Sequence, residues 1–593
     1  MAIELTKELL LSVRKPARYI GGEVNSIKKD LSKMFLKVCL CFPDTYEIGM
    51  SHLGLRILYD LINKQKDCVA ERVFSPWVDM EERLKTNHIP LFSLESKAAV
   101  RDFDILGFSL QYALAYTNVL NILHLSGIPL RASERRKQHP LVIAGGSCCL
   151  NPEPMAEFID CFIIGEAEEV ILEVIEIYKQ HKLRGGIERA TLLKTLSLIE
   201  GVYIPSLYQV EEKTYERTAL DSKAPLVISK RYVRDLEKVL NLEHWIVPYI
   251  EIVHDRIGIE IMRGCPNNCR FCQARTSFYP WRILSAEKIL ETIRRLYRMT
   301  GYEEISLLSL SSSDHPQLDQ IVKSLMEEFK NKGVSISLPS LRPNHLVGEL
   351  SKLFSSMRKT TLTFAPEAGS ERLRRLINKN VEIEELFDVA RRAYQAGYRL
   401  LKLYFMIGLP TESREDLEAI RDMCVKLSQM KKEIDGHPAR LNVTLSNFIP
   451  KPHTPFQWQA MTPPDDILEK QDDLRSLFRR SKGMIRVKFH DARASFLEAV
   501  LSRGDRRISR VIRHAFEAGA KFDAWGDLFN FSLWMDAFSR NSIDPKEYLI
   551  AKAFGDRLSW DFIDMGISRE NLIKEARLTA RVTCLTAGWH KKR

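Results

Sequence analysis

Two long blocks of this sequence alternate short apolar runs with helical stretches, and this alternation limits the fold more than any other feature. In the first block, residues 36–165, a helical stretch at 51–62 follows a run of β-branched and aromatic residues. The predicted strands of this block are FLKVCLCF (35–42), DILGFSL (104–110), PLVIAGG (140–146) and FIDCFIIG (158–165). Strands separated by helices predict an α/β fold, here a Rossmann-like parallel sheet with helices on its faces.

The second block begins near residue 257 and contains six predicted strands with helical stretches between them. The first of these helices, 285–299, is amphipathic and has Ser285 in position to cap its N-terminus. The six strands are predicted at 257–263, 304–310, 334–338, 360–365, 399–408 and 441–449. This order predicts a partial (β/α)6 barrel, and barrels of this kind keep their chemistry at the C-terminal ends of the strands.

The length of 593 residues exceeds what one hydrophobic core supports, so several domains are expected. The predicted organisation is a helical segment at 1–35, the first α/β domain at 36–185, a linker region at 186–245 with some helix or hairpin, the barrel at 246–460, and a mostly helical C-terminal domain at 461–593.

The composition favours a soluble protein of the cytoplasm. No apolar run approaches the ~20 residues that a membrane span needs, and the N-terminus lacks a signal-peptide cleavage site. Eleven cysteines are too few for a disulfide scaffold in a chain of this length, so clustered cysteines indicate metal or redox chemistry. The net charge of +11 is compatible with an anionic partner such as RNA but does not demonstrate one.

Three cysteines lie together directly after the first strand of the second block. Cys265, Cys269 and Cys272 have the spacing Cys-x3-Cys-x2-Cys, and the next cysteine is Cys424. Structural zinc sites and ordinary ferredoxin clusters take four protein ligands. Three thiolates on a [4Fe–4S] cube leave one iron open to a small ligand. The alternatives are three unrelated cysteines, or a zinc knuckle completed by His254 or His315.

On these residues the sequence resembles the radical S-adenosylmethionine (SAM) superfamily. The resemblance implies that the three cysteines hold the cluster and that SAM binds its open iron. It also implies reductive cleavage of SAM to a 5′-deoxyadenosyl radical, with the electron coming from a donor such as flavodoxin or ferredoxin. Phe271, before the third cysteine, matches an aromatic residue that lies near the adenine in relatives.

The same resemblance implies further SAM contacts at the ends of the later strands. Many relatives have Gly-Gly-Glu after the second strand, where this chain has serines and Asp314, whose alternative role is to cap a helix. The residues expected to contact SAM, besides Phe271, are Ser309, Arg342, Glu367 and Gly408.

The first α/β domain resembles the cobalamin-binding domains that precede many radical SAM barrels. The matching residues are Phe42-Pro43-Asp44, Gly107-Phe108-Ser109, Ala144-Gly145-Gly146 and Ile164-Gly165-Glu166-Ala167-Glu168-Glu169. The resemblance implies that the turns at Gly145, Gly146 and Gly165 approach a corrin. The Asp-x-His-x-x-Gly motif that supplies an axial histidine in other cobalamin proteins is absent. A Rossmann-like domain acting only as a scaffold is the alternative.

Nearly the whole chain resembles an uncharacterised bacterial family with this domain order. No substrate is known for that family, so the resemblance does not identify one. In the segment FIPKPHTPFQW (448–458) three prolines fix an extended loop, either a lid that offers His453 or a rigid crossing. Arg506, Arg510 and Arg513 have helical spacing and are available either to phosphates or to acids of the same protein.

The predicted function is that of a radical SAM enzyme acting on an unknown substrate, with cobalamin-dependent methylation or rearrangement as the reaction that the domain order implies. Two alternatives stay open. One is a radical SAM enzyme that modifies RNA without cobalamin. The other is a non-catalytic iron–sulfur binding protein.

Overall fold

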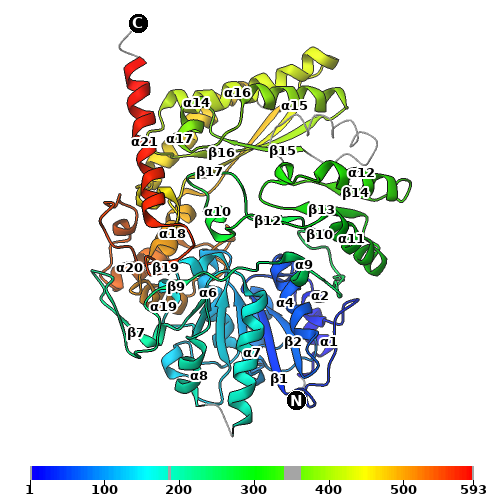
Figure 1. The fold of residues 1–593 in the computed structure, drawn as a ribbon, viewed down its shortest axis with the longest axis vertical. Coiled ribbons are helices and arrows are strands. Elements are labelled where there is room, and N and C mark those ends of the chain that lie inside the picture. Colours follow the sequence, from blue (N-terminus) through cyan, green and yellow to red (C-terminus); the bar gives the residue numbers. More distant parts are fainter. Residues whose placement is uncertain (1–2, 185–187, 340–361, 482, 590–593) are drawn as a thin grey trace.

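The computed structural model describes residues 3–184, 188–339, 362–481 and 483–589. The chain has the expected α/β class: a parallel sheet near the N-terminus, a second α/β unit above it, and C-terminal helices beside both (Figure 1). Among the described residues, no helix has the length and apolarity needed to cross a bilayer.

The N-terminal sheet has the order of a doubly wound fold. Its strands are β1 (Leu36–Phe42), β2 (Cys68–Phe74), β3 (Ile105–Ser109), β4 (Leu141–Gly145), β5 (Cys161–Ile163) and β6 (Val202–Tyr203). They follow the order β2-β1-β3-β4-β5-β6, parallel except for β6, which is antiparallel to β5. The strand order reverses between β1 and β3, and ligands of open α/β sheets bind at this point, outside the carboxyl ends of the strands.

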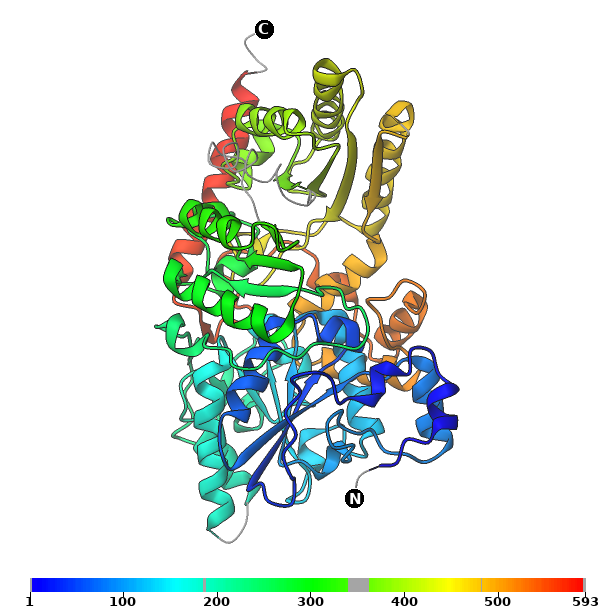
Figure 2. The same ribbon diagram turned by 90° about the vertical axis from the view of Figure 1, so that its right-hand side faces the viewer.

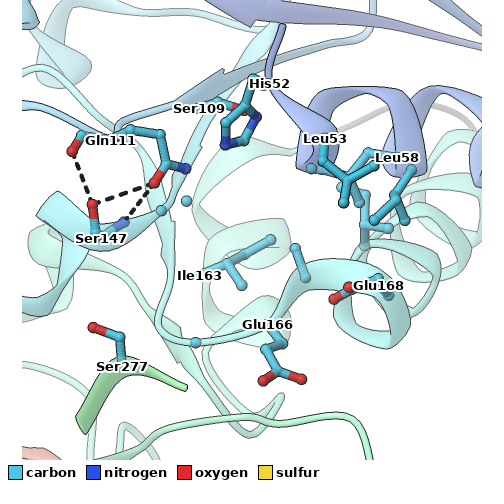
Figure 3. Close-up of a pocket in the computed structure, with 18 of the residues that line it drawn as sticks. His52, Leu53, Leu58, Ser109, Gln111, Ser147, Ile163, Glu166, Glu168 and Ser277 are labelled. Atoms are coloured by element: carbon cyan, nitrogen blue, oxygen red, sulfur yellow. Dashed lines mark hydrogen bonds between the residues drawn. The ribbon is translucent and has the colours of Figure 1, made fainter. Parts of the chain in front are cut away.

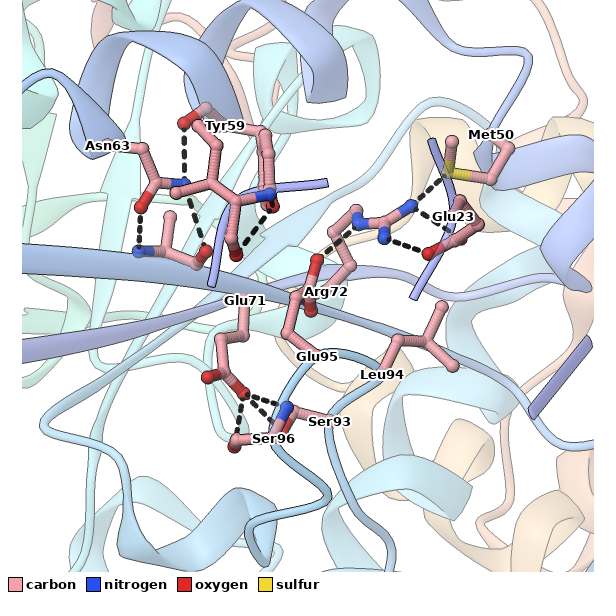
Figure 4. A network of polar contacts seen from close by, with 12 residues as sticks. Glu23, Met50, Tyr59, Asn63, Glu71, Arg72, Ser93, Leu94, Glu95 and Ser96 are labelled. Carbon is pink, nitrogen blue, oxygen red and sulfur yellow. Dashed lines mark hydrogen bonds and ion pairs between the residues drawn. The ribbon is translucent and has the colours of Figure 1, made fainter. Parts of the chain in front are cut away.

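Strand β2 is absent from the sequence prediction because its centre carries two charged residues, Glu71 and Arg72. Both are buried. The Arg72 guanidinium lies 2.8 Å from Glu23 and 2.6 Å from Glu95, while Glu71 accepts hydrogen bonds from the hydroxyls of Ser93 and Ser96 (Figure 4). Buried charges are tolerated when they are paired in this way, so the network allows a charged sequence to form a fully buried strand at the edge of the sheet.

The C-terminal helices complete the core of the N-terminal unit. These helices are α18 (Ala492–Arg503), α19 (Ile508–Glu517) and α20 (Phe531–Arg540). Their buried residues Leu497, Ile512 and Trp534 belong to the same hydrophobic cluster as the sheet. Asp523, in the connection between α19 and α20, accepts hydrogen bonds from Thr117 of α6 (Tyr116–Leu125) and from Trp534. Segments about four hundred residues apart therefore share one core.

The second unit contains two parallel sheets. The first has β10 (Ile257–Glu260), β13 (Glu304–Leu308) and β14 (Ser335–Ser337); the second has β15 (Leu362–Glu367), β16 (Leu400–Ile407), β17 (Arg440–Asn447) and β18 (Ile485–Phe489). All six predicted strands are present. Within the described ranges, which omit 340–361, β14 and β15 are not paired, so the strands form two halves of an open barrel (Figure 2). Strand β18 was not predicted, and it lies in the region predicted to be mostly helical, which also contains α17 (Pro464–Leu477) and α21 (Arg569–Trp589).

Helices cover the outer faces of these sheets. They are α11 (Ala286–Thr300), α12 (Leu318–Glu328), α14 (Glu371–Leu376), α15 (Ile383–Gln395), α16 (Arg414–Asp435) and α17 (Pro464–Leu477). The hydroxyl of Ser285 caps α11 as predicted, accepting a hydrogen bond from the backbone of Lys288. The connection between the units contains the hairpin β7 (Tyr208–Val210) and β8 (Arg217–Ala219), and β9 (Ile228–Ser229) pairs with β19 (Ile563–Asp564).

Candidate functional site: the cysteine loop and the pocket beneath it

The three cysteines lie on the loop between β11 (Met262–Arg263) and the short helix α10 (Gln273–Ser277), and each is partly exposed. The loop begins at Gly264, whose φ of +83° favours glycine, and a Cβ there would lie 2.6 Å from the carbonyl oxygen of Phe278. The loop therefore passes close to the chain that follows α10. Burial raises the pKa of the Cys272 thiol, while a hydrogen bond from the Arg275 backbone opposes that rise.

Two side chains of the loop itself anchor it to neighbouring elements. The amide of Asn267 donates to the sulfur of Cys265 at 3.4 Å and to Asp314 at 2.7 Å. The guanidinium of Arg270 donates to the carbonyl of Leu376 at 2.7 Å and pairs with Glu575 of α21 (Arg569–Trp589) at 3.1 Å. Asp314, for which the sequence left a capping role open, lies in a 3-10 turn and supports the cysteine loop.

The residues present fit a cluster better than a zinc ion. His315 is engaged at both ring nitrogens, with the carbonyl of Leu284 at 3.0 Å and the backbone N–H of Gln317 at 3.1 Å. His254 Nδ1 accepts from Arg256. In the described part of the chain, no three His, Cys, Asp or Glu side chains converge on a single metal ion. In a [4Fe–4S] cluster each thiolate binds a different iron, so the three sulfur atoms lie farther apart than the ligands of one metal ion. Soft thiolates are the usual ligands of such clusters.

Two of the predicted SAM residues, Phe271 and Gly408, lie beside the end of β16. Phe271 packs against an apolar cluster that includes Met406, Leu409 and Phe448, at the ends of β16 and β17. Gly408 lies in that turn with a φ of +77°, and its N–H donates to Glu412 at 2.7 Å. The structure thus brings the aromatic residue of the cysteine motif next to the turn after the fifth barrel strand.

Glu367 ends β15 in a strained conformation. Its φ of +69° is uncommon for a residue other than glycine, and the pairing of β15 with β16 shifts register there. Burial raises the pKa of its carboxyl group, while Lys379, 3.4 Å away, opposes that rise. Strain of this kind costs of order 1–3 kcal/mol and is concentrated at functional sites. Asn378, which precedes Lys379, donates to the backbone carbonyl of Asn268 at 2.8 Å, so this ion pair lies beside the cysteine loop.

Of the other two residues predicted to contact SAM, Ser309 is described by the structure and Arg342 is not. Ser309 follows β13, and its hydroxyl forms a 2.8 Å hydrogen bond with that of Ser312. Arg342 lies outside the described residues.

A cavity of about 320 Å³ lies at the carboxyl ends of the N-terminal strands, beneath the cysteine loop (Figure 3). This volume is typical of pockets for small molecules and cofactors. Its floor comes from Gly107 and Ser109 of β3 and from Ile163 of β5. The barrel unit supplies Glu260, Arg263, Ser277 and Phe278 to the opposite wall. The cavity therefore belongs to both units.

Gly145, Gly146 and Gly165, the three glycines expected to approach a corrin, all line this cavity. The structural reason for a glycine differs among the three positions. Gly146 has a φ of +116°, and a Cβ there would lie 2.6 Å from the carbonyl oxygen of Leu110. At Gly165, with a φ of +107°, a Cβ would lie 2.1 Å from the carbonyl oxygen of Arg231. These two positions need glycine because of the protein's own backbone. Around Gly145 the nearest atoms are those of Ile163 at 3.9 Å, so this glycine leaves its side of the cavity open.

His52 is the histidine that lines the cavity. Its Nδ1 accepts a hydrogen bond from the backbone N–H of Leu55 at 3.1 Å, which caps α4 (Leu53–Asn63). Burial lowers the pKa of His52 to about 4, so the ring is neutral near neutral pH. With Nδ1 accepting, Nε2 carries the hydrogen and acts as a donor.

An ion-pair network joins the cavity to the cysteine loop. Arg263, two residues before Cys265, is buried and lies 3.0 Å from Glu166 and 2.8 Å from Glu168. Glu166 also pairs with Arg282 at 2.6 Å. The sequence interpretation missed this link because its members lie about a hundred residues apart. The run Gly165-Glu166-Ala167-Glu168 was noted only for its likeness to cobalamin domains.

Two other segments have structural roles. The imidazole of His453 is buried and bonds through Nε2 to the carbonyl of Leu150 at 2.9 Å, so the proline-rich segment is a rigid crossing to the N-terminal unit. Each arginine of the 506–513 stripe has an acidic partner: Arg506 pairs with Glu153, Arg510 with Glu212, and Arg513 with Glu517. Pairing with acids of the same protein, the second interpretation of the stripe, is therefore confirmed.

Comparison with known proteins agrees with this architecture. A family model for the N-terminal region of radical SAM proteins matches residues 54–205, and a model for the radical SAM superfamily matches residues 259–424. An uncharacterised protein of Methanocaldococcus jannaschii is 26% identical over 495 residues, covering 82% of this chain and 92% of its own. An uncharacterised methyltransferase of Pyrococcus horikoshii is 30% identical over 169 residues, 28% of this chain and only 36% of its own.

Among solved structures, the cobalamin-dependent SAM radical enzyme OxsB with aqua-cobalamin bound is 13% identical to this chain, with a TM-score of 0.46 over 93% of this chain and 80% of its own. The two family models cover both α/β units, and the second includes the three-cysteine loop. The chain therefore belongs to the radical SAM superfamily, and it is a radical SAM enzyme.

Proposed function

We propose that this enzyme binds cobalamin in the cavity beneath the cysteine loop and methylates an unactivated carbon of its substrate. One observation carries the proposal: a single cavity at the switch point of the N-terminal sheet is walled on its other side by Ser277 and Phe278, which follow the cysteine loop. A cofactor bound there faces the barrel in which SAM is expected. The methyltransferase relative supports methyl transfer over rearrangement.

The protein's own residues have distinct tasks in this proposal. Cys265, Cys269 and Cys272 would hold the cluster, and Phe271 and Gly408 would position SAM. When bound, the cluster supplies the electron that cleaves SAM, and cobalamin supplies a cobalt able to carry a methyl group. His52 offers an N–H to the ligand in the cavity. The enzyme needs a reductant, for which a flavodoxin or a ferredoxin is the proposed donor.

Arg263 has a positioning role in this arrangement. Its ion pairs fix the first residues of the cysteine loop against the turn at Glu166, which lines the cavity. The distance between the two cofactors would then be set by a buried, charge-assisted contact, stronger than a neutral hydrogen bond. The walls of the cavity are mainly apolar and would limit the access of water to the reacting groups.

RNA is not part of this proposal. The arginine stripe was the main local feature that suggested phosphate binding, and its members are occupied by Glu153, Glu212 and Glu517.

Corrin binding tests the proposal directly. The protein is purified anaerobically, reconstituted with iron and sulfide, incubated with hydroxocobalamin, and desalted; retained corrin is read from the visible spectrum. Wild type should retain corrin close to one per chain. Gly107→Leu should lose it, because a side chain at Gly107 enters the cavity while its nearest neighbour, Leu40, is 3.6 Å away.

Gly526→Leu is the matched control, since a Cβ there meets no atom within 4 Å and the position lies outside the cavity. It should retain corrin like wild type. Absence of corrin from a wild-type protein with a complete cluster would contradict the proposal. Equal retention by Gly107→Leu and wild type would show that the corrin binds at another site.

A further inference from the structure

Among the described residues, helices cover one face of the sheet of β15–β18 and leave its other face, here called the uncovered face, without a helix. Leu401, Leu403 and Phe405 of β16 are fully buried in a cluster with residues of α15 and α16. The alternate residues Lys402 and Tyr404 point to the opposite face, because successive side chains of a strand alternate. Tyr404 is 42% exposed. The helices lie on the outer side of this sheet, so the uncovered face is turned toward the first half of the barrel (Figure 1).

Strand register places three cations together on this uncovered face. Lys402 is opposite Asn442, which is opposite Arg486, while Tyr404 is opposite Thr444, which is opposite Lys488. Neighbouring strands lie about 4.8 Å apart, and residues two apart on one strand lie about 6.6 Å apart. Lys402, Arg486 and Lys488 therefore share a surface with the ring of Tyr404.

These three cations lack the acidic partners that neighbouring cations have. In the described ranges, no ion pair or hydrogen bond is formed by the side chain of Lys402, Arg486 or Lys488. By contrast, the nearby Lys470, Arg475 and Lys451 pair with Glu412, Asp472 and Glu498. Glu367, the acid at the end of β15, is held by Lys379. The uncovered face therefore carries a positive charge that no acidic side chain of the described residues compensates.

We propose that this face, defined by Lys402, Tyr404, Arg486 and Lys488, binds an anionic group of the substrate. The substrate class is then a molecule that carries phosphate or carboxylate, held at the open edge of the barrel where β18 ends the sheet. Arginine binds both groups through two parallel hydrogen bonds, and lysine adds a point charge. This inference rests on the part of the proposed function that expects SAM in the barrel, where the substrate would meet it, and it does not depend on cobalamin.

Pyrophosphate is the probe that tests it. Equilibrium dialysis with radiolabelled pyrophosphate is run on the clustered protein at low salt, for wild type and for the double variant Arg486→Met, Lys488→Met. Wild type should bind the probe saturably. The double variant, which loses two cations, should bind it at least about tenfold more weakly, since tenfold corresponds to one charge-assisted contact. The control Arg136→Met, Lys137→Met removes an exposed Arg–Lys pair from the N-terminal unit and should leave affinity unchanged.

Equal affinity in wild type and the Arg486, Lys488 double variant would overturn the inference. So would an equal loss in the Arg136, Lys137 control. SAM affinity, measured on the same samples, should be unchanged in the double variant; a parallel loss would assign these cations to the carboxylate of SAM and overturn the substrate role. Corrin content, also read on these samples, separates failure of this inference from failure of cobalamin binding. Competition by glutarate distinguishes recognition of carboxylate from that of phosphate.

Discussion

Arg263 and Glu166 form the contact that ties the two α/β units together at the site: the guanidinium lies 3.0 Å from the carboxylate, and both groups are buried. Arg263 stands two residues before the first cysteine, and Glu166 follows the glycine turn of the cavity. Burying such charges is costly unless they are paired, so their placement here indicates a fixed geometry between the cavity and the cysteine loop.

Removing Arg263 should destabilise the protein strongly. Arg263→Met leaves Glu166 and Glu168 buried with fewer partners, and the free energy of unfolding should fall by about 3–5 kcal/mol. Urea unfolding measures this change. Arg294→Met, which removes a half-exposed pair with Glu328, should cost at most about 1 kcal/mol. A loss at Arg263 no larger than the loss at Arg294 would show that the network does not fix the loop.

Glu367 should lower the stability of the fold while contributing to SAM affinity. Glu367→Gly relieves the left-handed conformation and should raise the free energy of unfolding by about 1 kcal/mol, while SAM affinity falls. Unfolding and equilibrium dialysis with SAM measure the two effects. Asn331→Gly, at an exposed position with a φ of +66°, should bring the stability gain without the loss of affinity. Unchanged SAM binding in Glu367→Gly would remove Glu367 from the SAM site.

His453 should make the protein less stable in mild acid. Burial lowers the pKa of His453 to about 4, below its ordinary value of about 6.5, so the unfolded chain takes up a proton that the folded chain does not. This contribution is complete above about pH 6.5 and is lost as the pH falls toward 4, in total roughly 3 kcal/mol. Unfolding of wild type and His453→Gln across this range should give a flatter pH dependence for the variant. Parallel curves would contradict the burial of a neutral ring.

His52 should not be an axial ligand of the cobalt. Its Nδ1 accepts from the Leu55 backbone, so Nε2 carries a hydrogen and lacks a free lone pair. The electron paramagnetic resonance spectrum of bound Co(II) corrin should show no splitting from a histidine nitrogen, and His52→Gln should leave it unchanged. Corrin affinity of that variant should fall about fivefold, the value of one hydrogen bond. Nitrogen splitting that disappears in His52→Gln would contradict this role.

The parts of the fold that the sequence predicted are those set by local pattern. The strand–helix alternation, the Ser285 cap and the loop that carries Cys265, Cys269 and Cys272 depend on neighbouring residues, and all were found where expected. Strand β2 was missed because the partners of Arg72, Glu23 and Glu95, are distant in sequence. Strand β18 was missed although its sequence IRVKF has the apolar–charged alternation of a half-buried strand, because it is short and lies among residues predicted to be helical. The Arg263–Glu166 contact depends on how the two units pack against each other, and a local sequence pattern does not predict that packing.

The most direct test of the central claim is the reductive cleavage of SAM. Reconstituted protein is reduced with dithionite under anaerobic conditions, SAM is added, and 5′-deoxyadenosine is measured for wild type and for the triple variant Cys265→Ala, Cys269→Ala, Cys272→Ala. Wild type should form 5′-deoxyadenosine, and the triple variant should form none. A wild-type protein that holds its cluster, fails to bind SAM and forms no 5′-deoxyadenosine would contradict the account.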